Sequence, residues 1–95
     1  VLMVGAGAAG VGIARHVRHA LIAAGVPDEN VPDHLALFDV IGLVNMGSEG
    51  LEQHQHSVAW PAALAEARGL AGDASKDLVH VIETFQPTVL AGATA

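Results

Sequence analysis

The first ten residues constrain the fold of this chain more than any other segment. Val1–Val4 is a short apolar run typical of a buried β-strand, and the glycines that follow it have Gly-x-Gly-x-x-Gly spacing. In such a turn Gly5 allows the tight bend, Gly7 lets the backbone approach a phosphate, and Gly10 lets the helix pack close to the strand. The positive end of the helix dipole then faces the anion. The segment therefore predicts a strand–turn–helix unit that binds the pyrophosphate of a dinucleotide.

The composition is apolar for a chain of 95 residues. Hydrophobic residues make up 52% and charged residues 15% of the chain, and the mean hydropathy is +0.45. No uninterrupted apolar stretch reaches the ~18–20 residues that cross a bilayer, so we expect no membrane span. The chain begins inside an apolar strand, and the run 88–95 indicates another strand at its end. We interpret residues 1–95 as a partial NAD(P)-binding domain, truncated at both ends, whose apolar faces are covered by the remainder of a parent chain.

Charge and cysteine content exclude several classes of function. The net charge is −6, and four Lys/Arg residues are too few to line the phosphates of a nucleic acid. One tryptophan and two phenylalanines give no platform for base stacking. Without cysteine there is no disulfide framework, no Cys-based zinc site and no thiol nucleophile. We expect no nucleic-acid or membrane partner, and the composition fits a cytoplasmic protein, which is the location that we expect.

Apolar periodicity along the chain predicts alternating strands and helices. A helix that starts at about Ala9 or Gly10 ends before Gly25 and Pro27, which together form a stop signal. The predicted elements are a strand at 1–4, a helix to about 24, a polar connection at 27–33 with room for one helical turn, a strand at 35–38, an irregular loop at 40–57, a helix around 61–68, a helix capped by residue 73 or 75 and ended by residue 87, and a strand at 88–91. This order predicts an α/β fold, about half of a Rossmann-type doubly wound parallel sheet.

The ends of two predicted strands carry further candidate cofactor contacts. Asp39 ends the second predicted strand, where an acidic residue accepts hydrogen bonds from the ribose hydroxyls and disfavours a 2′-phosphate. It lies 29 positions after Gly10 rather than about 20, which a long helix and the connection after it explain. The alternative is that Asp39 only caps a turn. Small residues at the end of the last strand, Gly92, Ala93 and Thr94, would let a cofactor pass near its nicotinamide, or would serve close packing.

The six histidines do not indicate a metal site. His54 and His56 are two positions apart and His16 and His19 three apart, but no Asp, Glu or Cys joins either pair at a ligand spacing. Two arginines interleaved with the second pair would repel a cation. The serines lie in predicted loops without a nucleophile-elbow context. We therefore predict neither a metal ligand nor a catalytic residue in this chain, and we interpret Trp60 as a packing anchor.

Three segments carry a family resemblance. The run 5–14 resembles the Gly-Ala-Gly-x-Ala-Gly-x-Gly-Ile-Ala signature of malic enzymes and the related malolactic enzymes. The run 37–44 is similar to the family's strand that ends in Val-Asp and is followed, after two variable residues, by Gly-Leu. The run 77–92 resembles the family's helix before Lys/Arg-Pro-Thr-x-Leu-Ile-Gly. The three matches come in the family's order and cover nearly the whole chain.

The resemblance implies an NAD-dependent malic enzyme, which oxidises L-malate and decarboxylates the intermediate to pyruvate. In the family the catalytic Tyr and Lys and the carboxylates that bind Mg²⁺ or Mn²⁺ precede the glycine turn, so they fall outside these residues. A homo-oligomer is also expected. Val40, in place of a polar or basic residue, favours NAD over NADP. The implied cofactor contacts are Gly5, Ala6, Gly7, Ala8, Ala9, Gly10, Asp39, Val40, Gly92, Ala93 and Thr94.

Departures from the family pattern keep other interpretations open. Ser48 stands where the family usually has Arg, and Ala95 replaces the last glycine of its Ile-Gly-Val-Ser-Gly ending. A malolactic enzyme, which converts malate to lactate with bound NAD, is the nearest alternative. A non-catalytic nucleotide-binding module is another, and a structural piece with an accidental glycine turn is a third. Because half a sheet exposes an edge and apolar faces, we expect the isolated chain to aggregate or to be marginally stable.

Overall fold

The computed structural model describes residues 1–5 and 7–92, and within this part of the chain the strands form one four-stranded sheet in the order β3-β2-β1-β4. The strands β1 (Leu2–Val4), β2 (Ala36–Asp39) and β4 (Leu90–Gly92) are parallel, and β3 (Gly42–Leu43) is antiparallel to β2. The chain leaves β1 for β2 on one side and reaches β4 on the other. The strand order therefore reverses at β1, as in a Rossmann-type fold, and the predicted fold class is confirmed.

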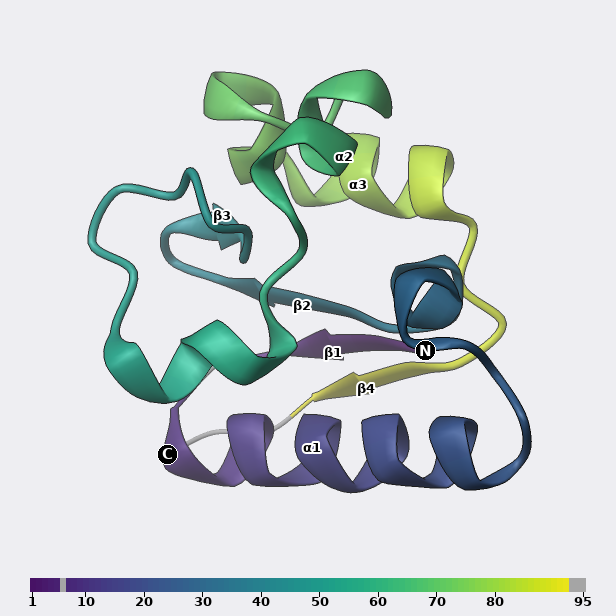
Figure 1. Ribbon diagram of the computed structural model, residues 1–95. Coiled ribbons are helices and arrows are strands. Elements are labelled where there is room, and N and C mark those ends of the chain that lie inside the picture. The colour runs from purple at the N-terminus through teal and green to yellow at the C-terminus, as the bar shows by residue number, and fades with distance from the viewer. Residues whose placement is uncertain (6, 93–95) are drawn as a thin grey trace.

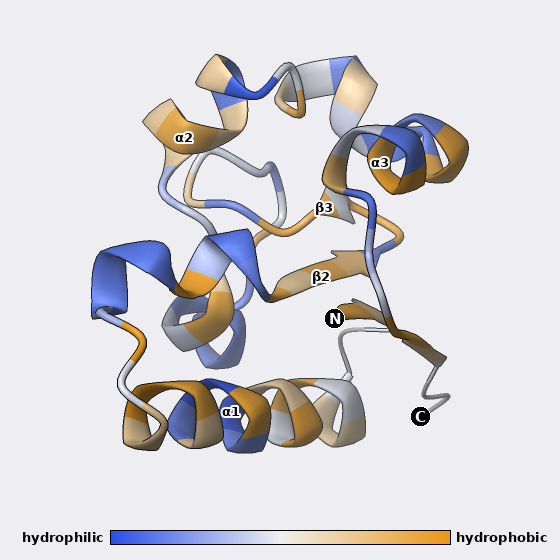
Figure 2. Ribbon diagram, turned by 90° about the vertical axis from the view of Figure 1, so that its right-hand side faces the viewer, coloured by the Kyte–Doolittle hydropathy of each residue, from blue (hydrophilic) through white to orange (hydrophobic). Residues whose placement is uncertain are grey.

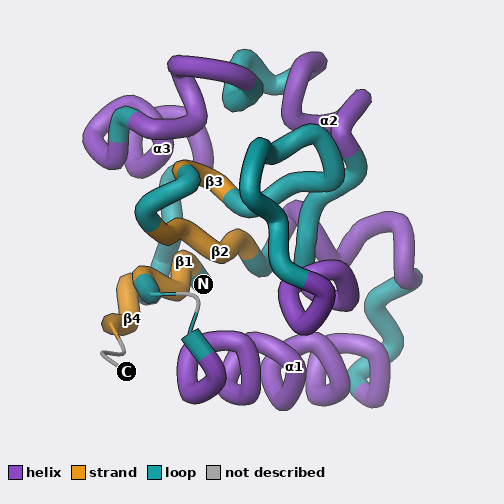
Figure 3. Tube along the Cα trace, turned by 90° about the vertical axis from the view of Figure 1, so that its left-hand side faces the viewer, coloured by secondary structure: helices purple, strands orange, loops and turns teal. Residues whose placement is uncertain are grey.

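The helices cover both faces of this sheet. In Figure 1, α1 (Ala8–Ala23) lies below the strands, and α2 (Ala62–Ala67) and α3 (Leu78–Phe85) lie above them. The same layers are visible from the side in Figure 3. Short 3-10 helices complete the connections: η1 (Asp28–Asp33), η2 (Gln53–Val58) and η3 (Gly72–Lys76). The helix η2 packs beside α1 rather than on the sheet's upper face.

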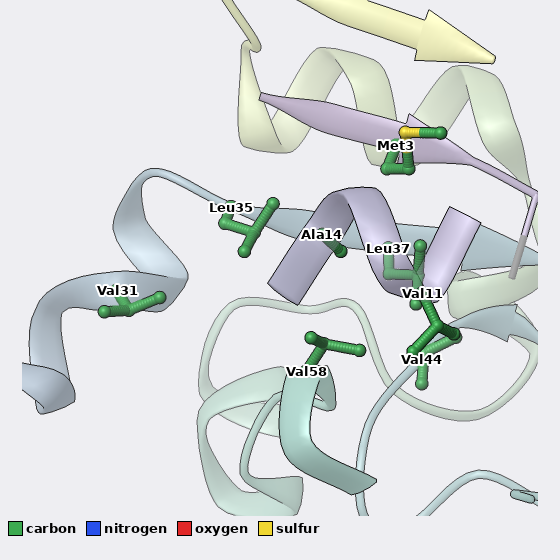
Figure 4. Packing of buried hydrophobic residues seen from close by; sticks show 8 residues of the cluster. All are labelled: Met3, Val11, Ala14, Val31, Leu35, Leu37, Val44 and Val58. Atoms are coloured by element: carbon green, nitrogen blue, oxygen red, sulfur yellow. The ribbon is translucent and has the colours of Figure 1, made fainter. Parts of the chain in front are cut away.

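Alternating side chains of the strands divide the core into two layers. Leu2 of β1 faces α3 and Met3 faces α1, as expected for strand residues buried on both sides. Figure 2 shows apolar β2 between the helical layers, whose helices carry both hydrophobic and hydrophilic residues. The lower layer, drawn in Figure 4, comprises Met3, Val11, Ala14, Val31, Leu35, Leu37, Val44 and Val58. The upper layer comprises Leu2, Ala36, Leu43, Trp60, Ala65, Leu70 and Val81.

Trp60 anchors the upper layer, as the sequence predicted. Its side chain is 1% exposed, and its indole Nε1 donates to the Leu35 carbonyl at 2.9 Å. The ring of Phe85 contacts it edge to face at 5.9 Å between centroids, and the Arg68 guanidinium lies 5.8 Å from its ring centre. These contacts tie α2, α3 and the start of β2 together.

The prediction of an irregular loop at 40–57 is wrong in two places. Gly42–Leu43 forms β3, in a hairpin whose turn is Val40–Ile41, and 53–58 forms η2. A two-residue strand is too short to show a period of two, so its apolar residues carried no strand signal. Gly42 takes a positive φ of 92°, and a side chain on it would meet Ser75 of η3 at 2.6 Å. The hairpin is therefore fixed by a close approach between segments far apart in the sequence.

Smaller differences concern boundaries. The helix α3 is capped by Asp77, whose carboxylate accepts from the His80 amide at 3.2 Å, and not by Asp73 or Ser75. Those two residues belong to η3, a separate 3-10 turn, and Ser57 likewise lies in η2 instead of a loop. The last strand begins at Leu90 and not at residue 88. The predicted stop of the first helix is confirmed, because α1 ends at residue 23 and Gly25 has φ 99°.

Candidate cofactor-binding site

The register of the sheet brings three of the predicted positions to one edge. Val4, the last residue of β1, pairs with Phe38 of β2 on one side and with Gly92 of β4 on the other. The amide of Gly5 then donates to the Phe38 carbonyl at 2.7 Å, so Asp39 is the next residue along the neighbouring strand. All of these are carboxyl ends of parallel strands at the point where the strand order reverses. Ligands of open α/β sheets bind in the crevice outside such an edge.

The glycine turn is shaped by close contact between its first and last glycines. Gly5 has φ 105°, a conformation that residues with a side chain rarely adopt. A Cβ placed on Gly10 would lie 1.8 Å from the Gly5 carbonyl oxygen, so no side chain fits there. Both glycines are therefore required by the backbone itself. The predicted roles of Gly5 in the bend and of Gly10 in close packing are consistent with this geometry.

The N-terminus of α1 presents backbone donors at this edge. Its N-cap, Gly7, has no side chain to accept a hydrogen bond, and the described first turn contains no acidic residue. The first bond of the helix runs from the Val11 amide to the Gly7 carbonyl at 3.0 Å, so the amides of Ala8, Ala9 and Gly10 precede the ladder. Ala8 and Ala9 are exposed. Backbone amides at a helix N-terminus, together with the positive end of the helix dipole, favour an anion such as a pyrophosphate.

Asp39 and Val40 lie where the second strand turns into the hairpin. Asp39 pairs with Gly42 across the hairpin and is half-buried, whereas Val40 is 91% exposed. Val40 lines a polar cleft of about 410 Å³, together with Asn45, Ser48 and Lys76 among others. Asp39 thus follows directly the residue that pairs with the glycine turn, and an open cleft lies beside the next residue, Val40.

A second cleft runs along α1 from the glycine turn. It has a volume of about 310 Å³ and is formed between α1 and the segment that begins η2; we call it the α1–η2 cleft. Sequence reasoning missed its outer wall because η2 was not predicted. The helical spacing of positions 8, 12 and 15 was a usable signal for the inner wall. Its lining includes Gly7, Ala8, Gly12 and Arg15 on one side and Glu52 and His54 on the other.

Some of the predicted contacts are not placed. Ala6, Ala93 and Thr94 lie outside the described residues. Gly92 is exposed at the end of β4, and a side chain added to it would meet no atom within 4 Å. Close packing within the described part of the chain therefore does not explain this glycine.

Histidines and carboxylates form no metal cluster in the described residues, where no group of three or more His, Asp or Glu could hold an ion. His54 nevertheless has an acidic neighbour, since its Nδ1 lies 3.2 Å from a carboxylate oxygen of Glu52. This contact joins one histidine of the pair to one carboxylate, which is fewer ligands than a metal site needs. Across 1–5 and 7–92, no helix has the length and apolarity to cross a membrane.

Comparison with known proteins matches the whole chain to one family. The family model described as "Malic enzyme, NAD binding domain" covers residues 1–95. An NAD-dependent malic enzyme of Shewanella denitrificans is 31% identical over 94 residues, which is 99% of this chain and 16% of that protein. A malolactic enzyme of Lactococcus lactis is 33% identical over 93 residues, which is 98% of this chain and 16% of that protein. The chain thus spans about one sixth of the length of these relatives.

Proposed function

The chain belongs to the malic enzyme family, in its NAD-binding domain, and from this premise we propose that it binds NAD at the carboxyl edge of the sheet for the oxidation of L-malate. NAD, when bound, supplies the acceptor for the hydride that leaves malate. The observation that carries the proposal is the uncapped N-terminus of α1 above a glycine turn that admits no side chain at Gly10.

The residues divide the binding of the cofactor among them. The amides of Ala8, Ala9 and Gly10 donate to the pyrophosphate, and the dipole of the sixteen-residue helix α1 adds a favourable field. The carboxylate of Asp39 accepts from the adenosine ribose hydroxyls and repels a 2′-phosphate. Val40 brings no cation to that position. These contacts favour NAD over NADP.

This chain orients the cofactor and leaves the proton chemistry to other parts of the protein. The described residues hold no cluster suited to Mg²⁺ or Mn²⁺, so a divalent ion would be bound by ligands elsewhere in the full-length protein. The family resemblance likewise implies that the catalytic Tyr and Lys lie outside this chain. The protein is proposed to act as a homo-oligomer in the cytoplasm.

A malolactic enzyme remains the second candidate, because a relative with that name is 33% identical to this chain. Product analysis on the full-length protein separates the two. Incubation with L-malate, NAD and Mn²⁺ is expected to give pyruvate, CO₂ and NADH in equal amounts. Lactate without net NADH would assign the malolactic reaction. Binding of NAD with neither product would leave a non-catalytic nucleotide-binding module.

A further inference from the structure

Gly12 has no structural reason to be glycine within the described part of the chain. It lies in the second turn of α1, where glycine favours the helix less than alanine does. A Cβ placed on it would meet no atom within 4 Å, in contrast to Gly10 two positions earlier. Its backbone is helical, so a positive φ does not demand glycine either. No contact within the described residues therefore requires glycine at position 12.

The space in front of Gly12 is the α1–η2 cleft. Ala8, Gly12 and Arg15 share one face of α1, and this face continues without interruption from Gly7 at the glycine turn. The cleft is therefore contiguous with the N-terminus of α1. A Cβ at position 12, which lines this cleft, would meet no atom within 4 Å.

The opposite wall of the cleft is held in place. The Arg15 guanidinium donates from Nε to the Ser57 hydroxyl at 3.0 Å and from Nη2 to the His54 carbonyl at 3.2 Å. Val58 of η2 packs in the same buried layer as Val11 of α1 (Figure 4). The two hydrogen bonds of Arg15 and the shared buried layer of Val11 and Val58 thus hold η2 against α1. The two walls of the cleft are therefore joined by direct hydrogen bonds.

We propose that Gly12 is a positioning residue that keeps the α1–η2 cleft open beside the pyrophosphate of the dinucleotide bound at the glycine turn. This inference rests on the proposed binding of NAD. It places the outer boundary of the cofactor site at η2, on Glu52 and His54, instead of at the glycine turn alone. Arg15 sets the width of the site through η2.

The test measures NAD binding to the full-length protein by isothermal titration, without substrate, for the natural protein, Gly12→Ala and Gly12→Leu. Ala20→Leu is the matched control, because Ala20 is an exposed residue of the same helix, about two turns beyond Gly12 and outside the cleft. Thermal unfolding without NAD accompanies each titration. We expect Gly12→Ala to melt at the same or a higher temperature than the natural protein, since alanine favours the helix.

Filling the cleft is expected to weaken NAD binding progressively, by roughly tenfold or more for Gly12→Leu, while Ala20→Leu binds as the natural protein does. Equal NAD affinity of all variants would overturn the role of Gly12 and leave the proposed cofactor site intact. If the natural protein itself does not bind NAD, the proposed function fails, which is a separate outcome. A variant that melts earlier without NAD would show that Gly12 has a structural role, which also contradicts the inference.

Discussion

Gly10 and Gly5 are in contact so close that neither a methyl group nor a water molecule fits between them: a Cβ on Gly10 would lie 1.8 Å from the Gly5 carbonyl oxygen. This contact joins the end of β1 to the first turn of α1. It fixes where the amides at the N-terminus of α1 stand relative to the carboxyl edge of the sheet. The cofactor site that we propose depends on this junction.

Gly10→Ala is predicted to destabilise the protein by about 3 kcal/mol or more, because the clash involves backbone atoms that cannot rotate away. Denaturant unfolding of the full-length protein measures the change. Gly12→Ala is the control, since it adds the same methyl group to the same helix in open space. Equal stability of the two variants would contradict the packing described here.

Asp39→Ala is predicted to weaken NAD binding about tenfold, the effect of losing hydrogen bonds between a carboxylate and ribose hydroxyls. Binding of NADP should change less or improve, because a repulsive charge is removed. Parallel titrations with both nucleotides measure this. Asp28→Ala serves as the control, since Asp28 lies in η1, away from the carboxyl edge. An unchanged ratio of NAD to NADP affinity would indicate that Asp39 only caps a turn and does not contact the ribose.

Trp60→Ala is predicted to lower the free energy of unfolding by about 3–5 kcal/mol, the usual loss for a buried tryptophan. Trp60→Phe keeps most of the apolar contact but removes the donor to the Leu35 carbonyl, so its cost should be about 1–3 kcal/mol. Urea unfolding followed by circular dichroism measures both. An unchanged free energy of unfolding in Trp60→Ala would show that the stability of the upper layer does not depend on Trp60.

The 95-residue chain produced alone is predicted to aggregate. β4 is an edge strand among the described residues, and three apolar side chains beside it or on α3 are strongly exposed: Val79 at 63%, Val89 at 52% and Leu90 at 57%. Size-exclusion chromatography with light scattering measures the state of the purified chain. A monomer that unfolds in one cooperative step would refute this expectation.

The parts of the fold with a strong local signal could be predicted from the sequence. The apolar run before Gly5, the helical periodicity of the segment that became α1 and the stop at Gly25 define β1 and α1 to within one or two residues. The spacing of Leu78, Val81, Ile82 and Phe85 likewise predicted α3, whose inward face they form. In these segments local preference and tertiary packing agree.

The remaining parts depend on contacts between distant segments. The strand β3 exists because Gly42 packs against Ser75, and η2 is held by Arg15 from 39 and 42 residues away. No local sequence pattern indicates such contacts, so the hairpin and the outer wall of the α1–η2 cleft were not predicted from the sequence. The glycine turn and Asp39 could be proposed as site residues because a motif and a strand end mark them in the sequence. The cleft wall formed by η2 could not be proposed, because η2 was not predicted.

Titration of the full-length protein with NAD, beside its Gly7→Val variant, tests whether the glycine turn binds the pyrophosphate of NAD. Gly7 has φ −71° and ψ −174°, extended backbone that valine also adopts, so the variant should fold. We predict that the natural protein binds NAD and that Gly7→Val, with an unchanged melting temperature, does not. NAD binding that survives in Gly7→Val, or is absent from the natural protein, would contradict this account.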